Sequence, residues 1–490
     1  MLFCFTKGGI TTSKFNTNAT IKTANQEGHA AYAMTDKAKL VTQVLTSFFN
    51  EAKFYGDNSA DMRETIQAVI KKDPAFVSNL AVFARRVFNM RSVSHVLTGY
   101  LAHTVEGKPY TRKTVKGVVL RGDDATEILS FYLNTFGKPI PNSLRKGLAD
   151  VFETFDEYTL AKYKGAGKGV KMRDVLCLCR PAPKDEAQSA LWKRLLEGEL
   201  ETPVTWETQL SAKGNNKETW ESLIDSGKVG YMALLRNLRN IILAGPDNIE
   251  KVFRVIEDPE AVKRSKQLPF RFLSAYRSVS GLAGSRAFDA LENAVEASVE
   301  NLPRLSGTTV IAVDVSGSMS SPVSRNSDIR CCEIGMMLGL IANKMCDNSI
   351  FYTFENKLEK PALSSRNGIL YTAVKEAKAS GGTNMDLPFH KMMEDRVNAD
   401  RIIIISDNMC NSGTTYWNKK TVQTLADEYR RQSGNGLWVH AIDLQGYGTQ
   451  QFHGPKTNII AGWSEKVFDF IQLAEQGEGA LEDTIANYQW

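Results

Sequence analysis

Residues Thr308–Ser318 read TTVIAVDVSGS, a run of β-branched residues that ends in the pattern Asp314-x-Ser316-x-Ser318. β-Branched residues pack well on a pleated, half-buried surface, so the run predicts a short buried strand. The turn that follows carries one carboxylate and two hydroxyl groups. We therefore expect these three side chains to meet at the carboxyl end of a strand.

The residues after this stretch alternate between strand-like and helical patterns. The predicted strands are Ser349–Phe354, Arg401–Ser406 and Leu437–Leu444, and the predicted helices are Cys331–Cys346, Tyr371–Ala379, Leu387–Arg396 and Lys420–Gln432. Alternation of buried strands with helices is typical of a parallel, doubly wound sheet. In such an α/β domain, the ligand site lies at the carboxyl ends of the strands.

Two further polar residues are predicted at that edge of the sheet. Thr383 lies in the loop Gly381-Gly382-Thr383, and Asp407 directly follows the Ile402–Ile405 run. An Asp-x-Ser-x-Ser pattern alone also fits an ordinary turn, because Asp and Ser favour turns. Three connections that deliver only hard oxygen donors to one edge instead favour a site for Mg²⁺ or Ca²⁺.

These five residues together resemble a known kind of metal site. Asp314, Ser316, Ser318, Thr383 and Asp407 match the metal-ion-dependent adhesion site of von Willebrand factor A domains. The resemblance implies a bound divalent metal ion, with Mg²⁺ as the first choice. It also implies that the hydroxyl groups touch the metal and that an acidic group of a partner protein completes its shell.

The first part of the chain reads as one helix after another. Apolar residues recur at helical spacing in Met62–Ile70, Pro74–Phe88, Ala125–Phe136, Asn142–Phe152, Glu186–Leu196, Gly230–Ile242 and Arg286–Val299. Many short helices without interleaved strands indicate an α-solenoid or an irregular bundle. We predict a helical module over residues 1–304 and a doubly wound α/β domain over residues 305–490.

Charge is distributed unevenly between these two parts. From Asn301 onward the chain has 18 Lys and Arg and 21 Asp and Glu residues, which leaves 42 of the 60 basic and 34 of the 55 acidic residues in residues 1–300. The resulting excess of basic residues suits an anionic partner for the helical module, although such an excess also arises by chance.

Several functional classes find no support in the sequence. Seven cysteines without framework spacing argue against a secreted disulfide scaffold, and Cys177 and Cys179 are expected to be buried free thiols. The chain shows no signal-peptide pattern and no apolar stretch of bilayer length, so we expect a cytoplasmic protein that contacts no membrane. It contains no P-loop motif, and no Ser-His-Asp order or paired carboxylates indicate catalysis, so we do not expect an enzyme.

Two basic surfaces are candidates for binding RNA. On a helical wheel of Met232–Ile242, one face is apolar and the opposite face carries Arg236, Asn237, Arg239 and Asn240. Such a face can contact phosphates and bases, although Arg and Asn also fix helices to one another. The second candidate is a glycine-rich segment whose basic residues are Lys162, Lys164, Lys168, Lys171, Arg173 and Arg180.

Five sequence segments of the helical module are similar to sequences of the Ro ribonucleoprotein autoantigen family, in which a TROVE module precedes an A domain. They are Gly137–Phe152, Phe155–Tyr163, Lys171–Pro183, Tyr231–Ile241 and Gln267–Arg277. The resemblance implies a ring of HEAT-like helical pairs that binds single-stranded 3′ ends of misfolded non-coding RNA. It also implies that small Y RNAs bind the outer face.

The resemblance implies that the segment around Lys162 contributes to the contact with a Y-like RNA. The chain departs from the family there, because Cys177 and Arg180 stand where the family has Arg and His. Arg180 keeps a positive charge but not an imidazole. A Y-like RNA is therefore expected to be recognised differently.

The leading interpretation is an RNA-binding component of a ribonucleoprotein that acts in RNA quality control. One alternative is a metal-dependent protein–protein scaffold without an RNA role. Another is a hydrolase that uses the metal on phosphoesters, which the lack of an obvious base near the motif disfavours. Nucleic acid that co-purifies with the protein would distinguish the first interpretation from the second.

Overall fold

The computed structural model describes residues 22–25, 28–47, 60–164, 169–282, 284–300, 302–323, 328–363, 367–411, 420–463, 465–476 and 481–490. The chain forms two compact units. Unit 1 comprises Met1–Phe49 and Lys213–Asp483, and unit 2 comprises Asn50–Ala212 and Thr484–Trp490. The predicted division between residues 304 and 305 does not coincide with this one, because the later helices of the helical module pack with the α/β domain.

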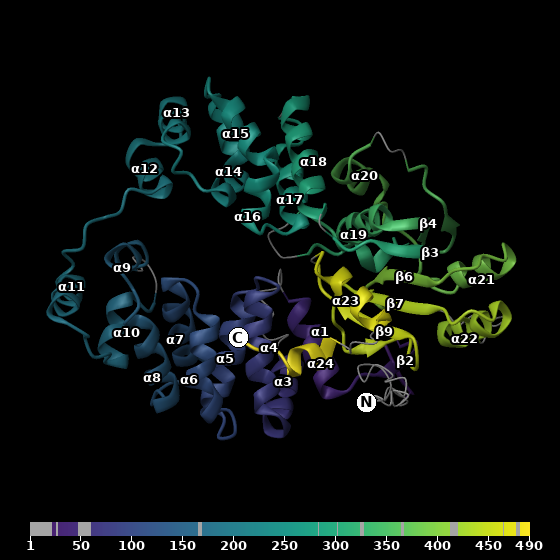
Figure 1. Ribbon diagram of the computed structural model, residues 1–490, viewed down its shortest axis with the longest axis horizontal. Helices are drawn as coiled ribbons and strands as arrows, with labels where there is room; N and C mark the ends of the chain where they lie inside the picture. The colour runs from purple at the N-terminus through teal and green to yellow at the C-terminus, as the bar shows by residue number, and fades with distance from the viewer. Residues whose placement is uncertain are drawn as a thin grey trace, which may run out of the picture. The chain divides into compact units, whose positions relative to one another are not determined.

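Unit 2 is an array of helices (Figure 1). They are α3 (Ala60–Lys72), α4 (Pro74–Arg86), α5 (Ser92–His103), α6 (Lys108–Val118), α7 (Gly122–Phe136), α8 (Asn142–Phe152), α9 (Glu157–Lys162), α10 (Met172–Cys179), α11 (Glu186–Glu197) and most of α12 (Trp206–Lys213). Alternate helices pack together, α4 with α6, α6 with α8 and α8 with α10, while α5 packs with α7. This stacking in two layers is the arrangement of helical repeats.

Local sequence determines where these helices begin and end. The Asp73 side chain accepts a hydrogen bond of 3.0 Å from the backbone N–H of Phe76, and Pro74 occupies the first turn of α4. Asp156 and Asp185 cap α9 and α11 in the same way. Helix α11 ends at Gly198, whose φ of 80° suits a residue without a side chain.

The last residues of the chain pack on the early helices of unit 2. The Tyr488 ring lies 5.2 Å from the Phe83 ring, nearly edge to face. The Trp490 ring lies against Gly117 of α6, where a side chain would collide with it, and Lys113 Nζ lies 4.4 Å from the ring centroid. Residues Thr484–Trp490 are therefore an integral part of this helical unit.

Unit 1 contains a second group of helices and the α/β domain. The helices of this group are α13 (Lys217–Asp225), α14 (Tyr231–Ala244), α15 (Ile249–Glu257), α16 (Pro259–Ser265), α17 (Pro269–Val279) and α18 (Ser285–Val299). Helix α1 (Asp36–Leu45) packs instead on the sheet of the α/β domain. Helix α14 packs on α15, α16 and α17, and α18 packs on the same three helices. The helical repeats thus extend into unit 1.

The α/β domain is built on a six-stranded sheet in the order β5-β4-β3-β6-β7-β9. The strands are β3 (Leu305–Asp314), β4 (Cys346–Phe354), β5 (Leu358–Glu359), β6 (Arg401–Ser406), β7 (Trp438–Asp443) and β9 (Thr457–Ala461). All neighbours are parallel except β4 and β5. The predicted fold class, helical repeats followed by a doubly wound domain, is confirmed.

Helices cover this sheet. They are α19 (Cys331–Met345), α20 (Ile369–Glu376), α21 (Leu387–Glu394), α22 (Val422–Ser433) and α23 (Val467–Glu475), with a 3-10 turn at Gly317–Ser320. A further short helix, α24 (Leu481–Ala486), begins in unit 1 and ends in unit 2. Helix α19 packs on β3, β4 and β6, whereas α23 packs on β7 and β9. Because β4 and β6 lie on opposite sides of β3, the chain reverses direction across the sheet at β3. This reversal places the switch point, where ligands bind in open α/β sheets, beside the end of β3.

A small antiparallel sheet in unit 1 was not predicted. It joins β1 (Lys22–Ala24), β2 (Ala30–Ala33) and β8 (Thr449–Gln450) in that order. Asn25 follows β1, and its Nδ2 donates a hydrogen bond of 2.9 Å to the backbone oxygen of Cys410. The N-terminal hairpin is therefore part of the α/β domain rather than of the helical array.

Helices α17 and α18 are joined to the α/β domain by polar contacts within unit 1. The Glu292 carboxylate accepts hydrogen bonds from the backbone N–H groups of Leu370 (3.0 Å) and Tyr371 (2.8 Å) at the start of α20. Arg277 pairs with Glu333 of α19, a residue without exposed surface. These contacts explain why the compact unit extends beyond the predicted boundary.

Candidate metal and nucleic-acid sites

Asp314 is the last residue of β3 and is fully buried. Both of its carboxylate oxygens accept hydrogen bonds: Oδ1 from the backbone N–H of Ser316 at 2.8 Å, and Oδ2 from the Ser406 hydroxyl at 2.5 Å. The hydroxyl oxygens of Ser316 and Ser318 lie 3.2 Å apart. The turn thus brings the two hydroxyl groups together and holds the Asp314 carboxylate against the Ser316 backbone, and whether the three side chains share a metal stays a prediction.

Asp407 lies at the same edge, directly after β6. Strands β3 and β6 are neighbours in parallel register, with Val313 opposite Ile405, so their carboxyl ends lie side by side. Burial and the negative charge of Asp314 raise the pKa of Asp407 to about 7, although hydrogen bonds from Ser318 and from the Met409 N–H act to lower it. The two carboxyl groups therefore interact strongly in a site that excludes most water.

Backbone hydrogen bonds bring the loop of Thr383 to both of these segments. The Gly381 carbonyl accepts a bond of 3.0 Å from the Gly317 N–H, and the Thr383 carbonyl accepts one of 3.2 Å from the Asn411 N–H. Gly381 has a φ of 68°, and a Cβ there would collide with Glu355 and Asn356. Only glycine fits this close approach, and Thr383 is 3% exposed.

The residues gathered here fit a divalent cation. Two adjacent buried carboxylates repel each other, and a cation with charge +2 between them would offset that repulsion. The remaining donors are hydroxyl oxygens, which suit Mg²⁺. No group of three or more His, Cys, Asp or Glu residues among the described residues could hold a metal. Such a site would therefore depend on two carboxylates with hydroxyl groups.

Asp443 is a third acidic residue at this edge, and it was missed. It ends β7, is fully buried, and accepts hydrogen bonds from the N–H groups of Gln445 (2.8 Å) and Gly446 (2.9 Å). Its charge also raises the pKa of Asp407. The signal was present in the sequence, because Asp443 ends an apolar strand just as Asp314 does.

The predicted polar face of α14 is only partly exposed. Arg236, Arg239 and Asn240 are exposed, but Asn237 is 7% exposed and its Nδ2 donates a hydrogen bond of 2.9 Å to the Ala233 carbonyl. The placement of Asn237 on the exposed face was wrong. It lies three residues after Leu234 and four before Ile241, so helical geometry places it on the buried stripe.

The basic segment that leads into α10 and extends to its C-cap, Arg180, is largely exposed. Lys162, Lys164, Arg173 and Arg180 are exposed, Lys171 is half-buried at the start of α10, and Lys168 lies outside the described residues. Lys162 Nζ contacts the Tyr158 hydroxyl at 3.3 Å. The expectation for the thiols is half right: Cys179 is buried, and burial raises its pKa to about 12, whereas Cys177 is exposed.

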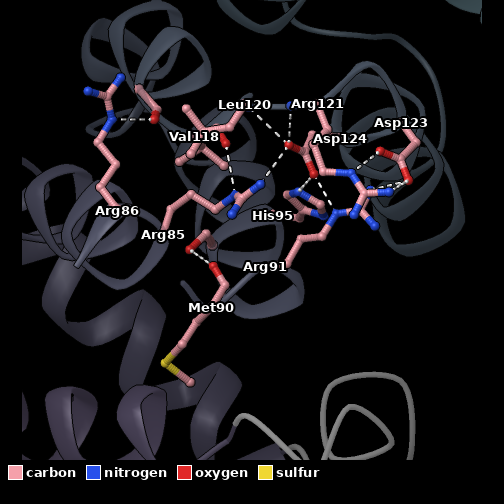
Figure 2. Close-up of polar contacts among 12 residues, drawn as sticks. Arg85, Arg86, Met90, Arg91, His95, Val118, Leu120, Arg121, Asp123 and Asp124 are labelled. Carbon is pink, nitrogen blue, oxygen red and sulfur yellow. Dashed lines mark hydrogen bonds and ion pairs between the residues drawn. The ribbon is translucent and has the colours of Figure 1, made fainter. Parts of the chain in front are cut away.

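A buried ionic network in unit 2 was not anticipated (Figure 2). The carboxylate of Asp124 in α7 accepts hydrogen bonds from Arg85 Nη2 (3.1 Å) and Arg91 Nε (2.5 Å), and it contacts His95 Nε2 (3.1 Å). Burial acts to raise the pKa of Asp124, but these three partners outweigh burial and lower it far below its usual range. Single residues at positions 85, 91, 95 and 124 form no recognisable motif, so only the structure reveals the network.

The fold and the geometry at the sheet edge define a class of protein, one with helical repeats joined to an A-type α/β domain. Comparison with family models identifies the family. The model for the TROVE domain matches residues 13–198 and 189–287, and the model for the Ro60 vWA domain matches residues 308–472. The chain belongs to the TROVE family.

Two curated relatives illustrate the range of the family. RNA-binding protein RO60 of Deinococcus radiodurans is 26% identical over 354 residues, which cover 61% of this chain and 65% of the relative. Telomerase protein component 1 of Rattus norvegicus is 25% identical over 328 residues, which cover 50% of this chain and 12% of the relative. The chain therefore matches less than two thirds of the length of either protein.

A solved structure shares the fold. The crystal structure of the Deinococcus radiodurans RO (RSR) protein superposes with a TM-score of 0.62 at 19% sequence identity, and the match covers 91% of this chain and all of that chain. In the part of the chain that the structure describes, no helix has the length and apolar character needed to cross a membrane.

Proposed function

We propose that this chain is an RNA-binding component of a ribonucleoprotein and acts in cytoplasmic RNA quality control. Its helical repeats bind single-stranded ends of misfolded or non-coding RNA and a Y-like small RNA. Its A domain holds Mg²⁺ and through it an acidic partner protein. The chain itself catalyses no reaction. The named RNA-binding relative supports the first part, and the donor set at the sheet edge supports the third.

The observation that supports the RNA proposal most directly is that α14 has two exposed guanidinium groups without an acidic partner among the described residues. Arg236 and Arg239 are exposed, and neither forms an ion pair with any residue that the structure describes. Arg286 of α18 differs, because it forms ion pairs with Glu250 (2.8 Å) and Glu257 (2.6 Å). Two unengaged guanidinium groups one turn apart are suited to RNA phosphates.

Salt-dependent binding of single-stranded RNA tests this proposal. Each phosphate contact contributes roughly 0.7 to the log–log slope of affinity against salt. The double variant Arg236→Gln/Arg239→Gln should therefore bind more weakly and with a shallower slope. The matched control is Lys251→Gln/Arg254→Gln on α15, which removes the same charge from residues that pair with Asp225 (2.8 Å) and Glu250 (3.7 Å).

Two results would contradict the role of α14. Affinity that equals the wild-type value at every salt concentration, in a variant that melts like the wild type, removes these residues from the RNA site. Weaker binding together with a lower melting temperature indicates a structural role instead, because an exposed guanidinium contributes little to stability.

Metal binding is tested separately on the full chain. Asp314→Ala and Thr383→Ala should abolish the heat of Mg²⁺ or Mn²⁺ binding in calorimetry, whereas Asp347→Ala, which removes a surface carboxylate paired with Arg304, should not. If Asp314→Ala binds metal as the wild type does, the assignment fails. Loss of metal should leave RNA affinity unchanged.

A further inference from the structure

A cavity of about 630 Å³ in unit 2 has no role in the sites described above. It lies between the end of α6, the start of α7, and helices α8 and α9. Its lining includes three aromatic residues, Phe155, Tyr158 and Tyr163, and two basic residues, Lys116 and Arg121. The volume is in the range of cavities that hold small ligands, roughly 300–1,000 Å³.

The aromatic rings of the cavity are accessible and lie close to cations. Tyr158 is 51% exposed, so its ring contributes little to the core and remains accessible to a ligand. The Tyr163 ring has the Arg121 guanidinium carbon 5.4 Å from its centroid and Lys162 Nζ at 5.6 Å. Lys162 Nζ also lies 5.4 Å from the Tyr158 centroid. One ammonium group therefore contacts both tyrosines at the rim.

The charge around the cavity is positive. Two basic residues, Lys116 and Arg121, and one acidic residue, Asp150, line it. Asp150 pairs with both Arg112 (2.7 Å) and Lys116 (2.9 Å). Asp123 forms ion pairs with both Arg121 (3.2 Å) and Arg91 of the buried network (2.8 Å). The lining thus carries one more basic than acidic residue, and that excess attracts an anion.

The wall that carries Arg121 is held in place by the buried network of Figure 2. The Asp124 carboxylate accepts hydrogen bonds from the backbone N–H groups of Leu120 (3.0 Å) and Arg121 (2.9 Å). Gly122 follows, and a Cβ there would meet the Thr159 and Tyr163 side chains at 2.6 and 2.9 Å. The connection between α6 and α7 is therefore tightly positioned against α9, and the cavity is preformed.

We propose that this cavity holds one unstacked nucleotide of a single-stranded RNA, with its base against Tyr158 and Tyr163 and its phosphate on Lys116 and Arg121. A nucleotide combines a flat π-surface with a negative charge, and the cavity presents rings and cations together. Bases within a duplex are stacked on each other and cannot enter. The inference rests on the proposed RNA-binding function and assigns it a second contact, separate from α14.

The test measures binding of a fluorescent single strand of about 12 nucleotides to the full chain, beside a duplex of the same length. Loss of one base–aromatic stack typically weakens binding about 10-fold. Tyr158→Ala should show such a loss for the single strand and little change for the duplex. Tyr158→Phe keeps the ring and should bind like the wild type.

Two further variants separate stacking from charge and from general surface effects. Arg121→Gln should weaken single-strand binding and reduce the salt slope by roughly 0.7, which a stacking ring does not do. Tyr371→Ala removes a ring that is 44% exposed on α20, outside the cavity, and should leave binding unchanged. The fluorescence of a 2-aminopurine base in the RNA strand should be quenched when the strand binds to the wild type. The quenching should be smaller with Tyr158→Ala.

Each outcome has a definite meaning. If the wild type binds no single-stranded RNA, both the proposed function and this inference fail. If it binds and Tyr158→Ala binds equally well, only the nucleotide cavity fails. Equal losses for single strand and duplex also overturn the inference, because a site for one unstacked nucleotide must distinguish the two. Thermal melting of each variant confirms that the fold is retained.

Discussion

The Ser406 hydroxyl donates a hydrogen bond of 2.5 Å to Oδ2 of Asp314, across the neighbouring strands β6 and β3. Because the Ser316 N–H holds Oδ1 at 2.8 Å, the orientation of the whole carboxylate is determined by the protein. Ser406 is 2% exposed and was not among the predicted ligands. In the proposed metal site, Ser406 positions the Asp314 carboxylate rather than serving as a ligand itself.

Ser406→Ala should therefore weaken metal binding without abolishing it. Loss of a group that orients a metal ligand typically costs about 10- to 100-fold in metal affinity. Calorimetric titration with Mn²⁺ measures the effect. Ser433→Ala, which removes a hydroxyl that bonds to the Tyr429 carbonyl at the end of α22, is the control and should bind normally. Wild-type affinity in Ser406→Ala would show that this hydrogen bond does not position the ligand.

Asp124→Asn should be strongly destabilising. The side chain of Asp124 is fully buried between Arg85, Arg91 and His95, and the variant removes the charge while keeping the shape. Breaking a buried ion pair on one side costs about 3–5 kcal/mol, because the remaining charge is left uncompensated. Urea denaturation followed by circular dichroism measures the loss.

Asp150→Asn is the matched control for that experiment. Asp150 also pairs with two basic residues, but Arg112 and Lys116 are about half exposed there. Water screens such pairs, so the control should lose less than about 1 kcal/mol. Similar losses in both variants would mean that burial does not determine the contribution of the network.

The free energy of unfolding should decrease at acidic pH because Glu475 becomes protonated. Burial acts to raise the pKa of Glu475, but hydrogen bonds from His440 (3.0 Å) and Arg401 (2.6 Å) outweigh it and lower the pKa to about 2. The folded state therefore binds this proton less readily than the unfolded state. The stabilisation is complete above the ordinary pKa of 4.5 and is lost as pH falls from 4.5 toward 2.

Glu475→Gln tests that dependence. The variant should be less stable at neutral pH and should lose less further stability between pH 4.5 and pH 2 than the wild type does. Glu428→Gln, whose partner Lys420 is exposed, is the control. Parallel stability curves for Glu475→Gln and the wild type in this pH range would exclude Glu475 as the responsible group.

Deletion of residues 484–490 should destabilise the helical unit locally. The deletion removes Ile485, Tyr488 and Trp490, of which Ile485 is fully buried. Loss of these apolar contacts should cost about 2–4 kcal/mol. Hydrogen exchange should accelerate in α4 and α6, which the tail contacts, and Gln489→Ala should show no such change. Unaltered exchange in these two helices would contradict the role of the tail.

Much of the α/β domain could be predicted because its signals are local. Strand β6, RIIIIS, is predicted and observed at Arg401–Ser406, and all six of its residues are buried. The positions of Asp314 and Asp407 follow from strand ends alone, since parallel strands bring their carboxyl ends to one edge. Whether the five gathered residues bind a metal stays a prediction.

Features that depend on distant partners could not be predicted. Strand β8 has two residues and exists only because Ala33 and Tyr32 of β2 pair with it, more than 400 residues away in the sequence. The sequence prediction placed Asn237 on the exposed face of α14 because the residue is polar, although its position in the helix falls on the apolar stripe. A helical wheel gives the angle of a residue, but the width of the buried face is set by the neighbouring helices.

The position of Thr484–Trp490 in the same unit as α4 and α6 has a consequence for synthesis of the chain. A ribosome adds roughly 5–20 residues per second. The surface around Phe83 and Gly117 is therefore synthesised some tens of seconds before the C-terminal segment that covers it. During that interval the whole α/β domain is translated. A nascent chain interrupted within that domain leaves the apolar surface of α4 and α6 bare, which makes it a substrate for chaperones and proteases.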